Sequence, residues 1–117
     1  MPTIRDLVAT IRQREGVEAA IVLGRDGLVI DGQLSEGLDG EDLSARIPAI
    51  LAAAESVEAS VQRGAMANIV LEYEFGVMLV SVLSGEALLL VLLSTGAHVG
   101  QLLLELRRNR EHIAALV

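Results

Sequence analysis

Residues 16–32 read Gly-Val-Glu-Ala-Ala-Ile-Val-Leu-Gly-Arg-Asp-Gly-Leu-Val-Ile-Asp-Gly, and this stretch decides the fold. Two apolar runs that contain β-branched residues flank the dipeptide Asp26-Gly27. Both residues of that dipeptide tolerate a positive φ, so the pattern predicts a β-hairpin with strands over residues 18–24 and 28–33. One helical pattern precedes the hairpin and a longer one follows it, and this order restricts the possible folds.

Apolar residues at helical spacing predict three helices, over residues 3–15, 40–62 and 97–115. Thr3 and Asp39 are the expected N-caps of the first two, because their side-chain oxygens can accept from backbone N–H groups of the first turn. Pro48 lies inside the second helix and removes one amide donor. It therefore predicts a bend or a later helix start at that point.

Three further strands are expected between the second and third helices. Residues 69–75 alternate apolar and polar side chains, which predicts a strand with one wetter face. Residues 77–83 and 87–94 are nearly continuous apolar runs, typical of strands covered on both faces. The sequence thus predicts one α/β domain over residues 1–117. Its single five-stranded, mostly antiparallel sheet has the middle helix on one face and the terminal helices on the other, in the order α-β-β-α-β-β-β-α.

Composition excludes several classes of function. The net charge of −7 disfavours free nucleic acid as a partner, since phosphate binding requires a basic surface. The chain has no cysteine, which excludes disulfides and thiolate chemistry, and no lysine, which excludes a lysine nucleophile. The N-terminus lacks a signal-peptide pattern, so a cytoplasmic location is expected.

Membrane insertion is not expected either. Residues 76–96 approach the length of a membrane span and carry one charge, Glu86. Ser84, Gly85 and Glu86 lie in the middle of this stretch, where a carboxylate costs roughly 2.5–3.5 kcal/mol on insertion scales. Two strands joined by a turn explain the pattern better than a spanning helix.

The sequence gives no sign of an active site. His98 and His112 are too far apart along one predicted helix to act as an i, i+4 metal pair, and both are expected at helix ends or on a solvated face. Glu72 and Glu74 share one face of a strand, whereas general acid–base catalysis needs two carboxylates in different environments. We predict no catalytic residue, no metal site, no cofactor and no enzyme activity.

The middle helix carries a face of small residues that has two possible explanations. Alanines and serines suit a solvated helix surface, and they also allow another helix to approach closely. The residues alone do not distinguish a solvated helix surface from a close helix–helix contact. The members of this face are Ala45, Ala49, Ala52, Ala53, Ser56 and Ser60.

The element order, the hairpin Gly16-Val17…Gly24-Arg25-Asp26-Gly27-Leu28-Val29 and the alanine-rich helix resemble the roadblock/dynein light chain family. The short chain and its Val- and Leu-rich late strands are similar to the bacterial, MglB-like branch. The resemblance implies a roadblock/profilin-like fold and a dimer with itself or a paralogue, in which strand 69–75 pairs with its symmetry mate and the middle helices pack together. The implied dimer residues are Ala45, Ala49, Ala52, Ala53, Ser56, Ile69, Val70, Leu71, Glu72 and Tyr73.

The resemblance also implies a function, which is binding a small Ras-like GTPase and modulating its nucleotide cycle. The residues implied in GTPase binding are Asp42, Arg46, Ala49 and Ala53, with Arg46 as a candidate arginine finger. Two alternatives remain. One is a dimeric scaffold or adaptor with no effect on GTP turnover, and the other is a small-ligand sensor domain with a cavity between sheet and helix.

Overall fold

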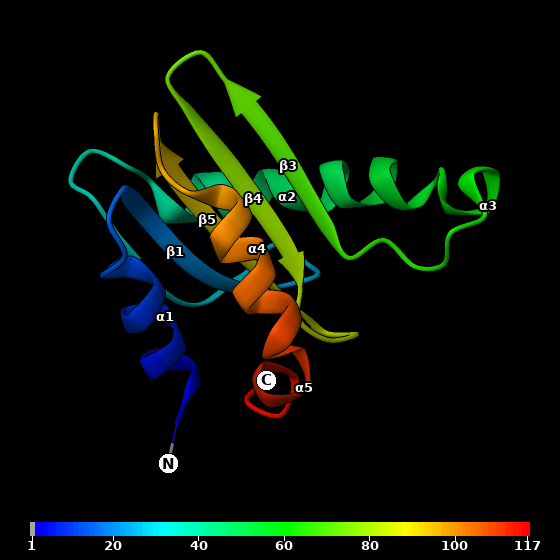
Figure 1. Ribbon diagram of the computed structural model, residues 1–117, viewed down its shortest axis with the longest axis horizontal. Helices are drawn as coiled ribbons and strands as arrows, with labels where there is room; N and C mark the ends of the chain where they lie inside the picture. Colours follow the sequence, from blue (N-terminus) through cyan, green and yellow to red (C-terminus); the bar gives the residue numbers. More distant parts are fainter. Residues whose placement is uncertain (1) are drawn as a thin grey trace.

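The computed structural model describes residues 2–117 as a five-stranded sheet with helices on both faces (Figure 1). Residue 1, where the predicted domain begins, lies outside the described residues. The elements in chain order are α1 (Ile4–Arg12), β1 (Val17–Gly24), β2 (Val29–Leu34), α2 (Gly40–Glu55), α3 (Glu58–Val61), β3 (Asn68–Tyr73), β4 (Gly76–Val82), β5 (Ala87–Ser94), α4 (Val99–Arg108) and α5 (Arg110–Ala114).

The strand order in the sheet is β2-β1-β5-β4-β3, and every neighbouring pair is antiparallel. This confirms the predicted sheet. β1 and β5 are central and almost entirely buried, as their continuous apolar sequences require. β2 and β3 form the two edges, and each pairs on one side only within residues 2–117.

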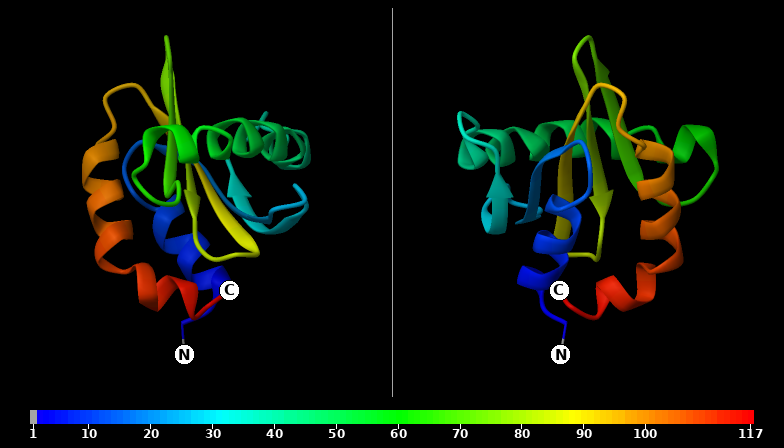
Figure 2. Two further views of the ribbon diagram at one scale, coloured as in Figure 1. Left: turned by 90° about the vertical axis from the view of Figure 1, so that its right-hand side faces the viewer. Right: turned by 60° about the vertical axis from the view of Figure 1, so that its left-hand side comes forward.

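The strands send alternate side chains into two separate cores, because successive residues of a strand point to opposite faces. Val22, Leu89 and Val91 pack on one face against α1, α4 and α5. Leu23 and Leu90 pack on the other face against α2. The sheet separates the two layers in the left view of Figure 2. The expected placement of the middle helix opposite the terminal helices is therefore confirmed.

The hairpin turn contacts the middle helix. Gly24 N–H donates to Leu28 O at 2.9 Å, and Leu28 N–H donates to the Asp26 carboxylate at 3.0 Å. Gly27 has a φ of +87° and lies against α2, where an added Cβ would stand 3.0 Å from the Ser44 carbonyl oxygen. Only glycine satisfies both the positive φ and this close approach.

The first two helices begin where the capping residues predict. Thr3 and Asp6 form a capping box, and the Asp39 side chain accepts from two backbone N–H groups at 3.1 Å each. α2 begins at Gly40 and continues through Pro48 to Glu55, so of the two outcomes predicted from Pro48, a bend or a later start, the later start does not occur. Gly27 fills the space beside the proline ring and the Ser44 carbonyl.

The long helices predicted over 40–62 and 97–115 are each divided in two. The first ends at Glu55, and the short α3 follows after Ser56 and Val57. The second is interrupted at Asn109 between α4 and α5, where the Asn109 side chain donates to the Glu105 carbonyl at 2.7 Å. Side chains that compete for backbone hydrogen bonds favour such interruptions.

The strand predicted over 69–75 is shorter than expected and ends at Tyr73. Tyr73 pairs with Gly76, so Glu74 and Phe75 form the turn into β4. Ile69 and Leu71 pack against the α2-side core as the alternation predicts, whereas Tyr73 and Phe75 are exposed. Tyr73 is the last residue of the strand, whereas Phe75 lies in the turn, which directs its side chain by its own backbone geometry rather than by strand alternation.

No helix among the described residues combines the length and the hydropathy needed to cross a bilayer. The apolar stretch over residues 76–96 forms β4 and β5, which are joined by a turn at Ser84–Glu86.

Gly27→Ala should destabilise the protein by about 2–5 kcal/mol, since the left-handed conformation costs about 1–2 kcal/mol and overpacking adds about 1–3 kcal/mol. The matched control is Gly37→Ala, which has a φ of +91° but no atom within 4 Å of the added Cβ, so it carries only the first cost. Urea unfolding of the two variants measures the difference. Equal losses of stability in Gly27→Ala and Gly37→Ala would show that close packing of the turn against α2 does not contribute.

Candidate functional site

The exposed side of α2 presents the residues that the sequence singles out. α2 buries Ser44, Ile47 and Leu51 fully and leaves the opposite side in solvent. We call this exposed side the α2 face. It consists of Asp42, Ala45, Arg46, Ala49, Ala52, Ala53 and Ser56, all of which are exposed. The helix residues that the resemblance implies in dimer contact and those that it implies in GTPase binding therefore lie on one surface.

The N-terminal half of the α2 face is charged. The Arg46 guanidinium donates to the Asp42 carboxylate through Nε at 3.3 Å and Nη2 at 3.2 Å. This hydrogen bond, together with the charge of Asp42, raises the pKa of Arg46 above its ordinary value. The pair is exposed to solvent, and such pairs break readily when a partner offers a better anion.

The C-terminal half of the α2 face is small and uncharged. Ala49, Ala52 and Ala53 expose only methyl groups, and the Ser56 hydroxyl donates to the Ala53 carbonyl at 2.6 Å. Its hydroxyl hydrogen is therefore satisfied within the helix. A surface of this kind loses little hydration and no side-chain entropy at its alanines when another surface covers it.

The β3 edge, residues 69–73, completes the candidate site. β3 pairs with β4 on one side, and no strand of residues 2–117 pairs with its other side. Val70 is 46% exposed and Tyr73 58%, and Glu72 is also exposed. Ile69 and Leu71 are half-buried on the side of the sheet that α2 covers.

The α2 face and the β3 edge lie toward the same end of the molecule. Figure 1 shows α2 crossing the sheet and continuing past β3, so that α3 lies beyond the last strand. Val57 and Val61 are therefore 52% and 53% exposed, although their helical spacing predicted a place on the apolar stripe. Neither valine could be recognised as a surface residue from the sequence, because no residue type marks the break after Glu55.

Two polar contacts hold this end of the molecule together. Arg25, in the hairpin turn, forms an ion pair with Glu55 at the end of α2, with N–O distances of 3.2 Å. The Glu58 carboxylate accepts from Met66 N–H at 2.6 Å and fixes the loop that leads into β3. Both contacts are half-buried, so they orient the end of α2 and the start of β3.

The two histidines and the pair Glu72 and Glu74 do not come together as an acid–base or metal centre. His98 is the exposed N-cap of α4 and His112 is exposed on α5, as predicted. Glu72 is exposed in β3 and Glu74 lies in the following turn. Among residues 2–117, no three His, Asp or Glu side chains are grouped to hold a metal ion.

An apolar hollow of about 210 Å³ lies between α1 and the C-terminal helices. At the border of this hollow, the Arg14–Glu105 ion pair joins the segment after α1 to α4. Its apolar lining comes from Leu7, Ile11, Leu102, Leu106, Ile113 and Leu116. The hollow is smaller than ordinary small-molecule sites, which span about 300–1,000 Å³. The sensor alternative gains little support from it.

Comparison with known families identifies one match. The family model of the Roadblock/LC7 domain matches residues 3–94. Protein MJ1340 of Methanocaldococcus jannaschii is 33% identical over 106 residues, which cover 91% of this chain and 92% of that protein. The matched segment contains α1 to α3 and the whole sheet, and therefore the complete candidate site.

Solved structures share the fold across nearly the whole chain. The gliding protein MglB from Thermus thermophilus has a TM-score of 0.81 at 17% identity, covering 96% of this chain and 86% of that one. A structure described as MglB with a tetrameric arrangement has a TM-score of 0.81 at 17% identity, with 96% and 85% coverage. Similarity at this level of identity establishes the five-stranded fold.

Glu58→Ala should loosen the loop before β3, because it leaves the half-buried Met66 N–H without its acceptor at a cost of about 1–3 kcal/mol. Trypsin cleavage after Arg63 should then accelerate about fivefold or more, the population change that corresponds to about 1 kcal/mol. Ser60→Ala, at an exposed position of the same short helix, is the control and should leave the cleavage rate unchanged. Equal cleavage of both variants would contradict the role of Glu58.

Proposed function

The chain belongs to the Roadblock/LC7 domain family, and from that membership we propose that it is a dimeric, non-catalytic regulator that binds a small Ras-like GTPase and modulates its nucleotide cycle. Members of this family are generally regulators rather than enzymes. The observation that carries the proposal is the small, uncharged half of the α2 face beside an unpaired edge strand. The proposed site of action is the cytoplasm.

Dimerisation through β3 follows from the state of its edge. An edge strand presents unpaired N–H and C=O groups, which a second strand satisfies. Pairing β3 with β3 of another copy around a two-fold axis would continue the sheet through both copies, with Ile69–Tyr73 at the centre. The tetrameric arrangement described for MglB supports self-association in proteins of this fold.

The same two-fold axis would bring the two α2 faces together. Ala45, Ala49 and Ala53 lie at four-residue intervals along α2, so they form one row. Alanine side chains let helix backbones approach closely, and each Å² of apolar surface buried contributes about 25 cal/mol. Val57 and Val61 lie beyond this row and would extend the apolar contact.

The paired α2 helices supply the proposed GTPase-binding surface. Asp42 and Arg46 border the small residues Ala49 and Ala53, so each copy offers both charges next to an uncharged strip. Arg46 can leave its exposed pair with Asp42 to contact an anionic group, including the phosphoryl oxygens stabilised by arginine fingers. The net charge of −7 suits a GTPase with a basic contact surface.

A scaffold or adaptor role uses the same surfaces and differs in one property. A regulator changes the rate of GTP hydrolysis or nucleotide exchange, whereas a scaffold binds without changing either. Measuring turnover alongside binding therefore separates the two.

Ala53→Glu should convert the dimer to a monomer at micromolar concentration, because it places a carboxylate from each copy in the apolar part of the interface between the two α2 faces. Light scattering coupled to size exclusion measures the mass. The matched control is Ala115→Glu, an exposed alanine at the C-terminal end of α5, which should remain dimeric. A monomeric parent protein would overturn the proposal.

Arg46→Ala should weaken binding of a candidate small Ras-like GTPase and reduce the effect of this protein on its GTP turnover, while the dimer persists. Loss of one exposed charged contact predicts a decrease in affinity of about fivefold, equivalent to about 1 kcal/mol. Calorimetry and phosphate release measure binding and turnover. Arg108→Ala, on α4, is the control and should leave both unchanged. Binding with no change in GTP turnover by the parent protein would identify a scaffold.

A further inference from the structure

The other edge of the sheet has a different chemical character. β2 pairs with β1, and no strand of residues 2–117 covers its outer side. Three consecutive apolar residues at its start are exposed: Leu28, Val29 and Ile30. Ile30 is 52% exposed and occupies a bulge, where the register between β1 and β2 shifts. Large exposed apolar groups on an unpaired strand mark a place where another chain can add.

Hollows flank this edge on both faces of the sheet. On the α2 side, Val29, Leu34 and Leu38 line a hollow of about 430 Å³ with Asp39 and Glu41. On the other side, a wider hollow of about 1,000 Å³ is bordered by Ile30, Asp31, Arg5, Glu111 and Leu116. A strand added beside β2 sends alternate side chains to opposite faces, so it would place them in the two hollows in turn.

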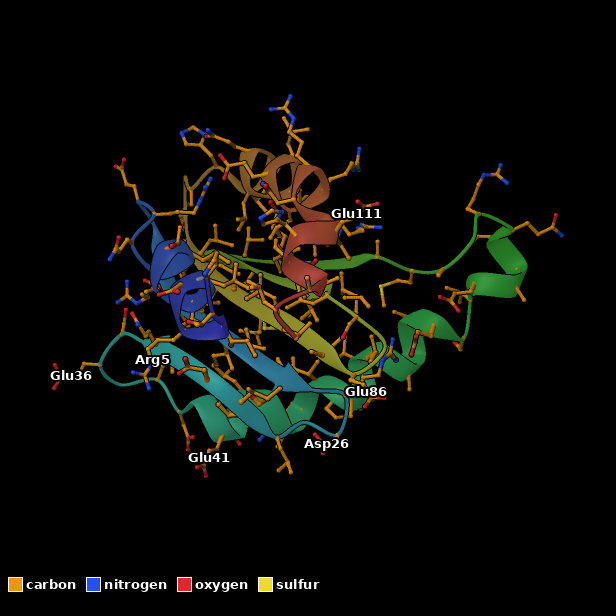
Figure 3. All side chains as sticks on the ribbon, turned by 90° about the horizontal axis from the view of Figure 1, so that it is seen from below. Arg5, Asp26, Glu36, Glu41, Glu86 and Glu111 are labelled. Carbon is orange, nitrogen blue, oxygen red and sulfur yellow. The ribbon has the colours of Figure 1, made fainter. Side chains whose placement is uncertain are left out.

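The charge around β2 is strongly negative. Residues 26–45 contain no basic residue. They carry the carboxylates of Asp26, Asp31, Glu36, Asp39, Glu41 and Asp42. Figure 3 shows Asp26, Glu36 and Glu41 around the ends of β2 at the outer margin of the molecule. Arg5 also borders the wider hollow, where Asp31 and Glu111 outnumber it. A chain that pairs with β2 therefore enters a field that attracts cations and repels anions.

We propose that the β2 edge binds an extended segment of a partner protein in which basic residues alternate with apolar ones, added as a further antiparallel or parallel strand. Backbone hydrogen bonds to β2 provide affinity, and the two hollows provide specificity for a segment in which basic and apolar side chains alternate. The basic side chains face Asp39 and Glu41 in the hollow on the α2 side, while the apolar side chains occupy the wider hollow bordered by Ile30 and Leu116.

A second copy of this chain is a poor occupant of the same edge. Two β2 edges would bring like charges together, which is destabilising. The bulge at Ile30 also interrupts the regular pairing that two identical edges need. A cationic segment avoids the charge repulsion and can adapt its register. β2 and β3 lie at opposite edges, so this site stays open in the proposed dimer and does not depend on it.

The test uses a fluorescein-labelled peptide of alternating arginine and valine, and fluorescence anisotropy to measure its binding to the full chain. The expected result is saturable binding that weakens as salt rises, with no binding of the matching glutamate–valine peptide. Equal binding of both peptides, or of neither, would overturn the proposal.

A pair of variants locates the binding site. Ile30→Lys adds a positive charge at the β2 edge and should weaken peptide binding about tenfold or more, a loss of about 1.4 kcal/mol. Leu104→Lys makes the same kind of change at a comparably exposed position of α4 and should leave peptide binding unchanged. Equal weakening by both variants would contradict a site at β2.

Amide chemical shifts of the parent protein locate the peptide-binding site without the use of a variant. Peptide addition should shift the signals of residues 29–34, and shifts confined to other residues would overturn the proposal. Light scattering tests whether a second copy of the chain occupies the β2 edge instead. Tetramers of the parent protein that are lost in Ile30→Lys would show that it does, and would overturn the proposal.

Discussion

A sheet that is apolar on both faces needs a helical layer on each, and this requirement governs the rest of the structure. β1 and β5 are buried from both sides, so neither core could exist without its helices. α1, α4 and α5 cover one face and leave α2 as the main cover of the other. Because α2 needs only a narrow stripe of buried residues to do this, its opposite side is free to become a contact surface.

The two edges of the sheet have acquired different surroundings, and this separates the contacts each can make. α2 carries uncharged small residues and continues past β3, and like surfaces without strong charge can meet their own copy. β2 lies among carboxylates, so an identical copy is repelled and a cationic chain is attracted. The proposed self-association and the proposed partner binding therefore use opposite edges of the sheet and do not compete.

Much of the fold and part of the site could be predicted. The hairpin at Asp26-Gly27, the caps at Thr3 and Asp39, the strand number and the two-sided helical cover rest on local turn chemistry and periodicity. The exposure of the alanine row on α2 also follows from periodicity. The break after Glu55 could not be predicted, because the spacing of Val57 and Val61 fits a continuous helix. Those valines are exposed since the chain has passed beyond the last strand and has no sheet left to cover.

The sequence by itself determined the element types, the hairpin, the aliphatic core and the absence of thiol and lysine chemistry, because these depend on residue identity and on neighbours close in the chain. Only the tertiary structure decided which strands became edges and what lies beside each. Strand order joins residues far apart in sequence, such as β1 to β5, and places β2 and β3 at opposite ends. Pairings of this kind arise from the packing of the whole sheet between its helices, which no local pattern encodes.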